Sequence, residues 1–150
     1  MTLPEGYSLR KLKESDYDNQ YIDTLKVLTT VGEISSSQFS DLFKHWEANS
    51  SIYHPYVITN SVGSVVSTGM LLVEKKLIHG CGSVGHIEDI SVASSEQGKR
   101  LGSTMVAHLA ELSKELGCYK VILDCSEHNV KFYEKGGFKN EGVEMCKRFD

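Results

Sequence analysis

Two adjacent carboxylates, Glu88 and Asp89, interrupt the largely apolar run His86–Val92. Consecutive residues of a strand point to opposite faces, so both carboxylates cannot lie on a solvated face unless the strand bulges or splays. A buried carboxylate needs partners or a raised pKa, and a raised pKa is the usual condition of a general base. The run therefore predicts a proton acceptor, and the alternative is an exposed strand edge without a chemical role.

A glycine-rich segment, Gly98–Ser103, lies between this run and a long helical pattern. Backbone N–H groups converge in such a loop and the helix N-terminus adds partial positive charge, so the segment suits an anion. The segment matches neither G-x-x-x-x-G-K-[ST] nor G-x-G-x-x-G. It predicts a site for another phosphate-bearing ligand, with an ordinary tight turn as the alternative.

A further carboxylate and a tyrosine lie downstream. Asp124 follows the apolar run Val121–Leu123, and ligands bind in the crevice beyond the carboxyl ends of parallel strands. Tyr133 lies beside Phe132 on a short predicted helix, and for this tyrosine packing in the core is the alternative to a chemical role.

The elements that position these residues follow from the spacing of apolar side chains. Strands are predicted at Tyr7–Leu12, Tyr56–Thr59, Val65–Lys76, His86–Val92, Tyr119–Cys125 and Val143–Arg148. Helices are predicted from Ser15 to Leu28, from Ser36 to Trp46, from Leu101 to Leu116 and over Asn129–Lys135. The strands between residues 56 and 92 form an antiparallel meander, and the long helix then leads by a right-handed crossover into a short buried parallel strand.

The chain has 150 residues, with 16 Lys and Arg against 20 Asp and Glu, so its net charge is −4. This length predicts one α/β domain over residues 1–150. The acidic balance disfavours nucleic acid as a partner, and no apolar run approaches the roughly 20 residues that span a membrane. The cysteines, Cys81, Cys118, Cys125 and Cys146, include no C-x-x-C pair, which predicts reduced core thiols in a cytoplasmic protein and no zinc site.

The order of strand, Gln97–Gly102 loop, long helix, strand and Asn129–Phe138 segment resembles the GNAT superfamily of acetyl-CoA-dependent N-acetyltransferases. Over nearly the whole chain, the sequence is also similar to the eukaryotic glucosamine-6-phosphate N-acetyltransferase family. Five motifs carry that similarity: Leu25–Gly32, Gly85–Ile90, Gly117–Lys120, Asn129–Lys135 and Gly142–Met145. Arg100 departs from the superfamily pattern, in which a glycine is common at this point, whereas Gly98 and Gly102 are retained.

The resemblance implies a three-layer α+β fold whose mixed central sheet opens between two splayed parallel strands, with acetyl-CoA in the opening. It assigns acetyl-CoA to Ile90, Ser91, Val92, Gly98, Lys99, Arg100, Leu101, Gly102, Ser103, Asn129 and Tyr133. It assigns an amino-sugar phosphate to Thr29, Lys76, Leu77, Ile78, His79, Glu88, Asp89, Tyr119, Lys120 and Arg148. It implies no metal.

The resemblance also implies direct acetyl transfer to the sugar amine in a ternary complex. Glu88 or Asp124 would accept the proton of the amine, directly or through water. The backbone N–H of Ile90 would stabilise the oxyanion, and Tyr133 would protonate the leaving thiolate. The family forms homodimers whose C-terminal strand crosses over, so Arg148 would serve the partner's site.

Two alternatives to this function stay open. One is an acetyltransferase for another amine, such as a polyamine or a protein lysine, and the other is a non-catalytic acyl-CoA-binding module. Because both expected ligands are phosphorylated, five cations, Lys76, Lys99, Arg100, Lys120 and Arg148, are expected to outweigh the carboxylates Glu88, Asp89 and Asp124 at the site.

Overall fold

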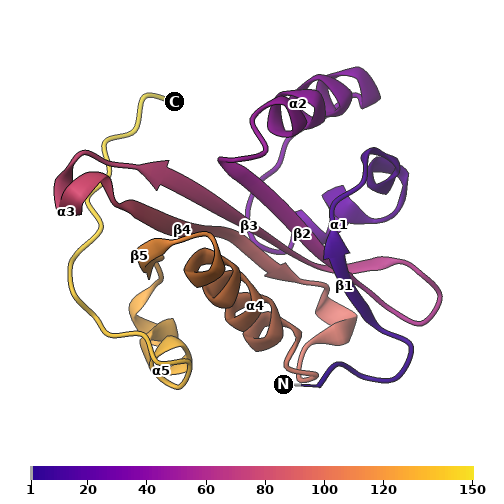
Figure 1. The fold of residues 1–150 in the computed structure, drawn as a ribbon. Helices are drawn as coiled ribbons and strands as arrows, with labels where there is room; N and C mark the ends of the chain where they lie inside the picture. Colours follow the sequence, from indigo (N-terminus) through magenta and orange to yellow (C-terminus); the bar gives the residue numbers. More distant parts are fainter. Residues whose placement is uncertain (1) are drawn as a thin grey trace.

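The computed structural model describes residues 2–150, and its strands form one sheet in the order β1-β2-β3-β4-β5 (Figure 1). The strands are β1 (Ser8–Lys11), β2 (Tyr53–Thr59), β3 (Val65–Lys75), β4 (Ser83–Val92) and β5 (Cys118–Ile122). Neighbours from β1 to β4 pair antiparallel, and β4 pairs with β5 in parallel. The predicted meander and parallel crossover are confirmed.

Helices cover both faces of the sheet (Figure 1). They are η1 (Glu14–Asp18), α1 (Tyr21–Leu25), α2 (Ser36–Ala48), α3 (Ile78–Cys81), η2 (Ser94–Glu96), α4 (Leu101–Glu115), η3 (Glu127–Asn129) and α5 (Val130–Glu134). The side chains of β2 alternate between two cores: Ile58 packs with Leu109 of α4, whereas Val57 packs with Phe39 of α2. This alternation produces the expected three layers. Within residues 2–150, no helix is both long enough and apolar enough to cross a membrane.

The helix predicted from Ser15 to Leu28 is instead two short helices, η1 and α1. Gln20 separates them with a left-handed φ of 67°, which a continuous right-handed helix does not admit. Asp16, at 1% exposure, accepts two hydrogen bonds from Arg10, each at 2.8 Å. A buried carboxylate in need of such partners therefore determines the local chain path more strongly than the apolar spacing does.

The parallel pair separates where the resemblance places the ligand opening. Ser83–His86 pairs with Cys118–Ile122, and β4 then continues to Val92 without β5 beside it. The strand predicted over Tyr119–Cys125 therefore ends at Ile122. It is also less buried than predicted, because Tyr119 and Ile122 remain 40% and 41% exposed.

The predicted strand Val143–Arg148 is wrong for the single chain, since the structure has neither helix nor strand beyond α5. A strand needs a neighbour to satisfy its backbone N–H and C=O groups, and this segment has none within residues 2–150. The prediction of core thiols is also wrong: Cys81, Cys125 and Cys146 are exposed and Cys118 is half-buried, although all four are free. Cys81 lies in the exposed turn between β3 and β4, and Cys125 and Cys146 follow β5, where no helix or strand of residues 2–150 covers them.

Candidate active site

A β-bulge accounts for the two adjacent carboxylates of β4. Thr68 pairs with Ser91 and Met70 pairs with Glu88, so the single residue Gly69 lies opposite both Asp89 and Ile90. Asp89 adopts a left-handed φ of 54°, a conformation that Asp tolerates better than most residues. The bulge re-aims the side chains, as the sequence required, and it leaves Asp89 and Ile90 without a register partner.

Glu88 is half-buried beside other carboxylates. Burial raises its pKa above the usual range, and the negative charges of Asp89 and Asp124 raise it further, while His86 acts in the opposite direction. A carboxylate with a raised pKa is a better proton acceptor near neutral pH than an ordinary glutamate. Asp89 and Asp124 are exposed, and the structure thus distinguishes Glu88 from the other two predicted carboxylates.

The glycine-rich loop approaches α4 through left-handed backbone. Gly98 has a φ of 90° and Arg100, which precedes Leu101 of α4, has a φ of 61°. A Cβ added at Gly98 would meet nothing within 4 Å, so this backbone faces open space. Converging N–H groups at a helix N-terminus, open to approach, suit an anion such as a diphosphate.

Tyr133 lies on α5, half-buried against the core, with the ring of Phe138 at 6.0 Å. Burial is the main cause that raises the pKa of its hydroxyl, and the nearby Cys125 adds to it. The phenol is therefore protonated at neutral pH and available as a donor. Packing and donation do not exclude each other here, because the ring is held while the hydroxyl has no hydrogen-bond partner within residues 2–150.

Several predicted sugar-phosphate residues meet around the turn between β3 and β4. The ring of His79 stacks on that of Tyr119 at 4.1 Å, which joins α3 to β5. Lys120 lies over the Tyr119 ring at 5.9 Å. Leu77 and Ile78 precede this stack and are exposed. This cluster presents aromatic, imidazole and ammonium groups together at the end of the parallel pair.

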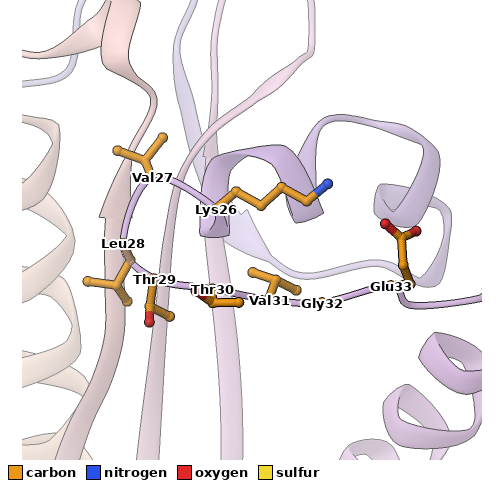
Figure 2. A pocket seen from close by; sticks show the side chains of 8 residues that line it. All are labelled: Lys26, Val27, Leu28, Thr29, Thr30, Val31, Gly32 and Glu33. Carbon is orange, nitrogen blue, oxygen red and sulfur yellow. The ribbon is translucent and has the colours of Figure 1, made fainter.

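Thr29 lies in the segment between α1 and α2, beside a hollow of about 510 Å³ lined by residues 26–33. Figure 2 shows the extended path of this segment, with the Thr29 hydroxyl directed away from the Lys26 amino group. The hollow brings the Thr29 hydroxyl to the surface just after the end of the helix predicted from Ser15 to Leu28.

Three of the five predicted cations are already paired within the chain. Lys76 contacts Glu74 at 3.2 Å, Lys99 contacts Glu96 at 2.7 Å and Arg148 contacts Asp150 at 3.0 Å. The positive charge available to a ligand is therefore smaller than the sequence count suggested. Arg148 also forms no bond with another predicted site residue among residues 2–150, so the single chain does not join it to the β4 cluster.

Sequence reasoning missed four residues that act on this region. Glu74 holds both Lys76 and His86, Tyr7 and Glu96 hold Lys99, and Glu144 adds to the raised pKa of Glu88. The three-residue spacing of Glu96 and Lys99 was a signal for one of these pairs. Tyr7 and Glu144 lie too far away in the sequence to have given one.

Comparison with known proteins places this geometry in a family. Residues 13–138 match the profile described as the acetyltransferase (GNAT) family. The chain belongs to the GNAT family. The bulged β4, the opening beside β5 and the loop before α4 are thus features of a GNAT domain in this chain.

Two curated GNAT relatives and one crystal structure are similar over almost the whole chain. The glucosamine 6-phosphate N-acetyltransferase of Candida albicans is 67% identical over 149 residues, covering 99% of this chain and 100% of the relative. The enzyme of the same name from Arabidopsis thaliana is 39% identical over 149 residues, with the same coverage. The crystal structure of the Arabidopsis enzyme covers 97% of this chain and 100% of its own, at a TM-score of 0.94 and 39% identity.

Proposed function

We propose that the protein transfers the acetyl group of acetyl-CoA to the 2-amino group of D-glucosamine 6-phosphate. The observation that carries this proposal is the 67% identity to a relative of that name, which extends over the full length of the relative. Acyl transfer to an amine requires a proton acceptor, an oxyanion donor and a proton donor for the leaving group, and we assign these roles to Glu88, the N–H of Ile90 and Tyr133.

The sugar amine attacks as the free base, so its ammonium form must first lose a proton. Glu88 accepts that proton directly or through a water molecule, with Asp124 as the second candidate. Burial and the neighbouring carboxylates raise the pKa of Glu88, which favours this role. The negative charges of Asp89 and Asp124 also attract the ammonium group to the place where it is deprotonated.

Attack of the amine on the thioester carbon forms a C–N bond and moves the π electrons of the C=O bond onto the oxygen, which becomes an oxyanion. The bulge leaves Ile90 without a register partner, so its N–H is the donor assigned to that oxyanion. In other acyl-transfer enzymes the loss of one such donor costs roughly 2.7–4 kcal/mol. The C–S bond then breaks as the carbonyl re-forms, and the protonated phenol of Tyr133 donates its proton to the departing CoA sulfur. The cationic nitrogen of the adduct loses its extra proton as the amide forms, and this proton restores the phenol.

The remaining predicted residues bind the two substrates. The backbone of Gly98–Ser103 receives the diphosphate of acetyl-CoA, Ile90–Val92 lies along its pantetheine arm and Asn129 flanks the opening. The cluster of His79, Tyr119 and Lys120 faces the sugar phosphate together with Thr29. Lys76 is paired with Glu74, and Arg148 with Asp150. Each cation can bind the sugar phosphate only if the phosphate replaces that carboxylate.

We also propose a homodimer in which the C-terminal segment forms a strand with the partner. Val143, Met145 and Phe149 are 89–90% exposed, and an extended strand would present all three on one face, with Lys147 between Met145 and Phe149. Such a strand would bring Arg148 to the partner's sugar phosphate. We further propose that the protein acts in the cytoplasm, in the reactions that lead to UDP-N-acetylglucosamine.

The test measures release of CoA thiol from acetyl-CoA with glucosamine 6-phosphate, glucosamine, spermidine and a lysine peptide as acceptors. The proposal expects turnover with the phosphorylated sugar far above that with the other three. A preference for spermidine or the peptide would assign the site to a different amine. Binding of acetyl-CoA without turnover of any acceptor would indicate a non-catalytic module.

A further inference from the structure

The lysine of the glycine-rich loop is held by two residues from other parts of the chain. Lys99 Nζ donates to Glu96 Oε2 at 2.7 Å and to the Tyr7 hydroxyl at 3.0 Å. The Tyr7 hydroxyl in turn donates to the same Glu96 oxygen at 2.6 Å. The three side chains therefore form a closed ring of hydrogen bonds, and its acceptor residue, Glu96, is only 9% exposed. We call this ring the Tyr7–Glu96–Lys99 triad.

The triad joins the N-terminal segment to the glycine-rich loop at Lys99, where the backbone of the loop is most constrained. Tyr7 precedes β1 and is 89 positions from Glu96, which is the last residue of η2. Lys99 lies between two residues with left-handed backbone, Gly98 and Arg100. Left-handed backbone is unfavourable for a residue such as Arg, so it persists only where the surrounding structure imposes it. The hydrogen bonds of the Lys99 side chain connect this strained backbone to Tyr7 and Glu96 and so help to hold its conformation.

The triad also neutralises the charge of Lys99. Its hydrogen bond to Glu96 raises the pKa of Lys99, and the bonds from Lys99 and Tyr7 lower the pKa of Glu96. Both groups therefore remain ionised and paired at neutral pH. A lysine paired in this way adds little net attraction for an anion, so its contribution to the loop is geometric.

We propose that Tyr7, Glu96 and Lys99 are positioning residues that hold the Gly98–Ser103 loop in the conformation that receives the diphosphate of acetyl-CoA. This inference rests on the proposed function, which places the diphosphate on that loop. It makes Tyr7, in the N-terminal segment, and Glu96, a carboxylate of the same sign as the ligand, determinants of acetyl-CoA affinity. Arg100, whose side chain has no ion pair within residues 2–150, is then the charged group of the loop that is free to meet the ligand.

The decisive variant is Glu96→Gln, tested by calorimetric binding of acetyl-CoA and by steady-state kinetics. If Lys99 acted by direct attraction to the diphosphate, removing the competing Glu96 charge would tighten binding. The triad predicts the opposite, a Kd and a KM for acetyl-CoA raised about three- to tenfold, the range expected when one hydrogen-bonded link is weakened. The kcat and the KM for glucosamine 6-phosphate stay unchanged.

Tyr7→Phe, which removes only the hydroxyl, is expected to raise the same two constants by a similar factor. Because both substitutions break one ring, the double variant should cost less than the product of the two single effects. Matched controls are Tyr17→Phe, which removes a hydroxyl bonded to the Ile34 carbonyl at 2.6 Å, and Glu111→Gln, which removes an exposed pair with Lys114 at the same spacing. Neither control residue contacts the loop, and neither variant should change acetyl-CoA binding.

Tighter or unchanged acetyl-CoA binding in Glu96→Gln would overturn the inference, as would an equal loss in the Tyr17→Phe control. Wild-type protein that binds acetyl-CoA but does not acetylate glucosamine 6-phosphate would contradict the proposed function instead. In that case the binding measurements still decide on the triad, because they need no turnover.

Discussion

The antiparallel strands β1 to β4 and the part of the chain from β5 to the C-terminus differ in how far their side chains are buried. In β2 and β3, Val57, Ile58 and Leu71 are completely buried between helices on both faces. Beyond β4, β5 keeps an exposed face and the C-terminal segment has no element beside it. The first part is complete within one chain, whereas the second leaves β4 without β5 beside it after His86 and leaves apolar side chains exposed at the C-terminus. The residues assigned to chemistry lie at the boundary between the two, where β4 leaves β5.

Leu109→Ala should have the largest effect on the antiparallel part. Leu109 of α4 is fully buried over the sheet, and a large-to-small change in such a core costs about 2–5 kcal/mol of unfolding free energy. Urea unfolding followed by circular dichroism measures this loss. A loss below about 1 kcal/mol would mean that this core is not the main source of stability.

Tyr133→Phe should have the largest effect on the open part and almost none on stability. The ring keeps its packing against Phe138, while the donor to the CoA sulfur is removed. We expect kcat to fall by about 100-fold, with the Kd for acetyl-CoA nearly unchanged. Tyr17→Phe is the matched control in the α1–α2 layer. Equal activity of the two variants would leave Tyr133 with a packing role only.

Asp124→Asn tests which carboxylate at the boundary accepts the proton. Burial and the charges of Asp89 and Asp124 raise the pKa of Glu88, so removing one of these charges lowers it. Because Glu88 acts in its deprotonated form, the acidic limb of the kcat/KM profile should move to lower pH. Loss of activity at every pH would assign the role to Asp124 instead. Glu111→Gln, on the exposed face of α4, should leave the profile in place.

Met145→Ser should have the smallest effect on a single chain. Met145 is 90% exposed, and a surface substitution of this kind changes the unfolding free energy of the monomer by no more than about 0.5 kcal/mol. The proposed dimer nevertheless loses buried apolar area, so sedimentation should shift from dimer towards monomer. If the variant sedimented as the same dimer as the wild type, the interface would lie elsewhere. The C-terminal segment would then not be an edge that a second chain completes.

Much of the fold followed from local pattern. The spacing of Leu101, Met105 and Leu109 predicted the long helix, and the three apolar runs between residues 56 and 92, separated by turn residues, predicted the meander. The patterns failed where a single tertiary bond or a missing neighbour decides the path. The buried Asp16 and the left-handed Gln20 break the first helix, and the absence of a partner strand leaves Val143–Arg148 without strand structure.

The sequence by itself determined the chemistry available at the site. It placed two carboxylates in one apolar strand, a glycine-rich loop before the strongest helix and a tyrosine after the parallel strand. Those positions follow from residue type and short-range spacing, which the chain carries in any conformation.

Only the tertiary structure decided how these groups are charged and aimed. The bulge opposite Gly69 re-aims Asp89 and Ile90, and burial near Asp124 distinguishes Glu88 from the other carboxylates. The Tyr7–Glu96–Lys99 triad converts a lysine that looked like a ligand cation into a support for the loop. Burial, pKa and hydrogen-bond geometry depend on neighbours that are distant in the sequence, and for that reason no local pattern could have specified them.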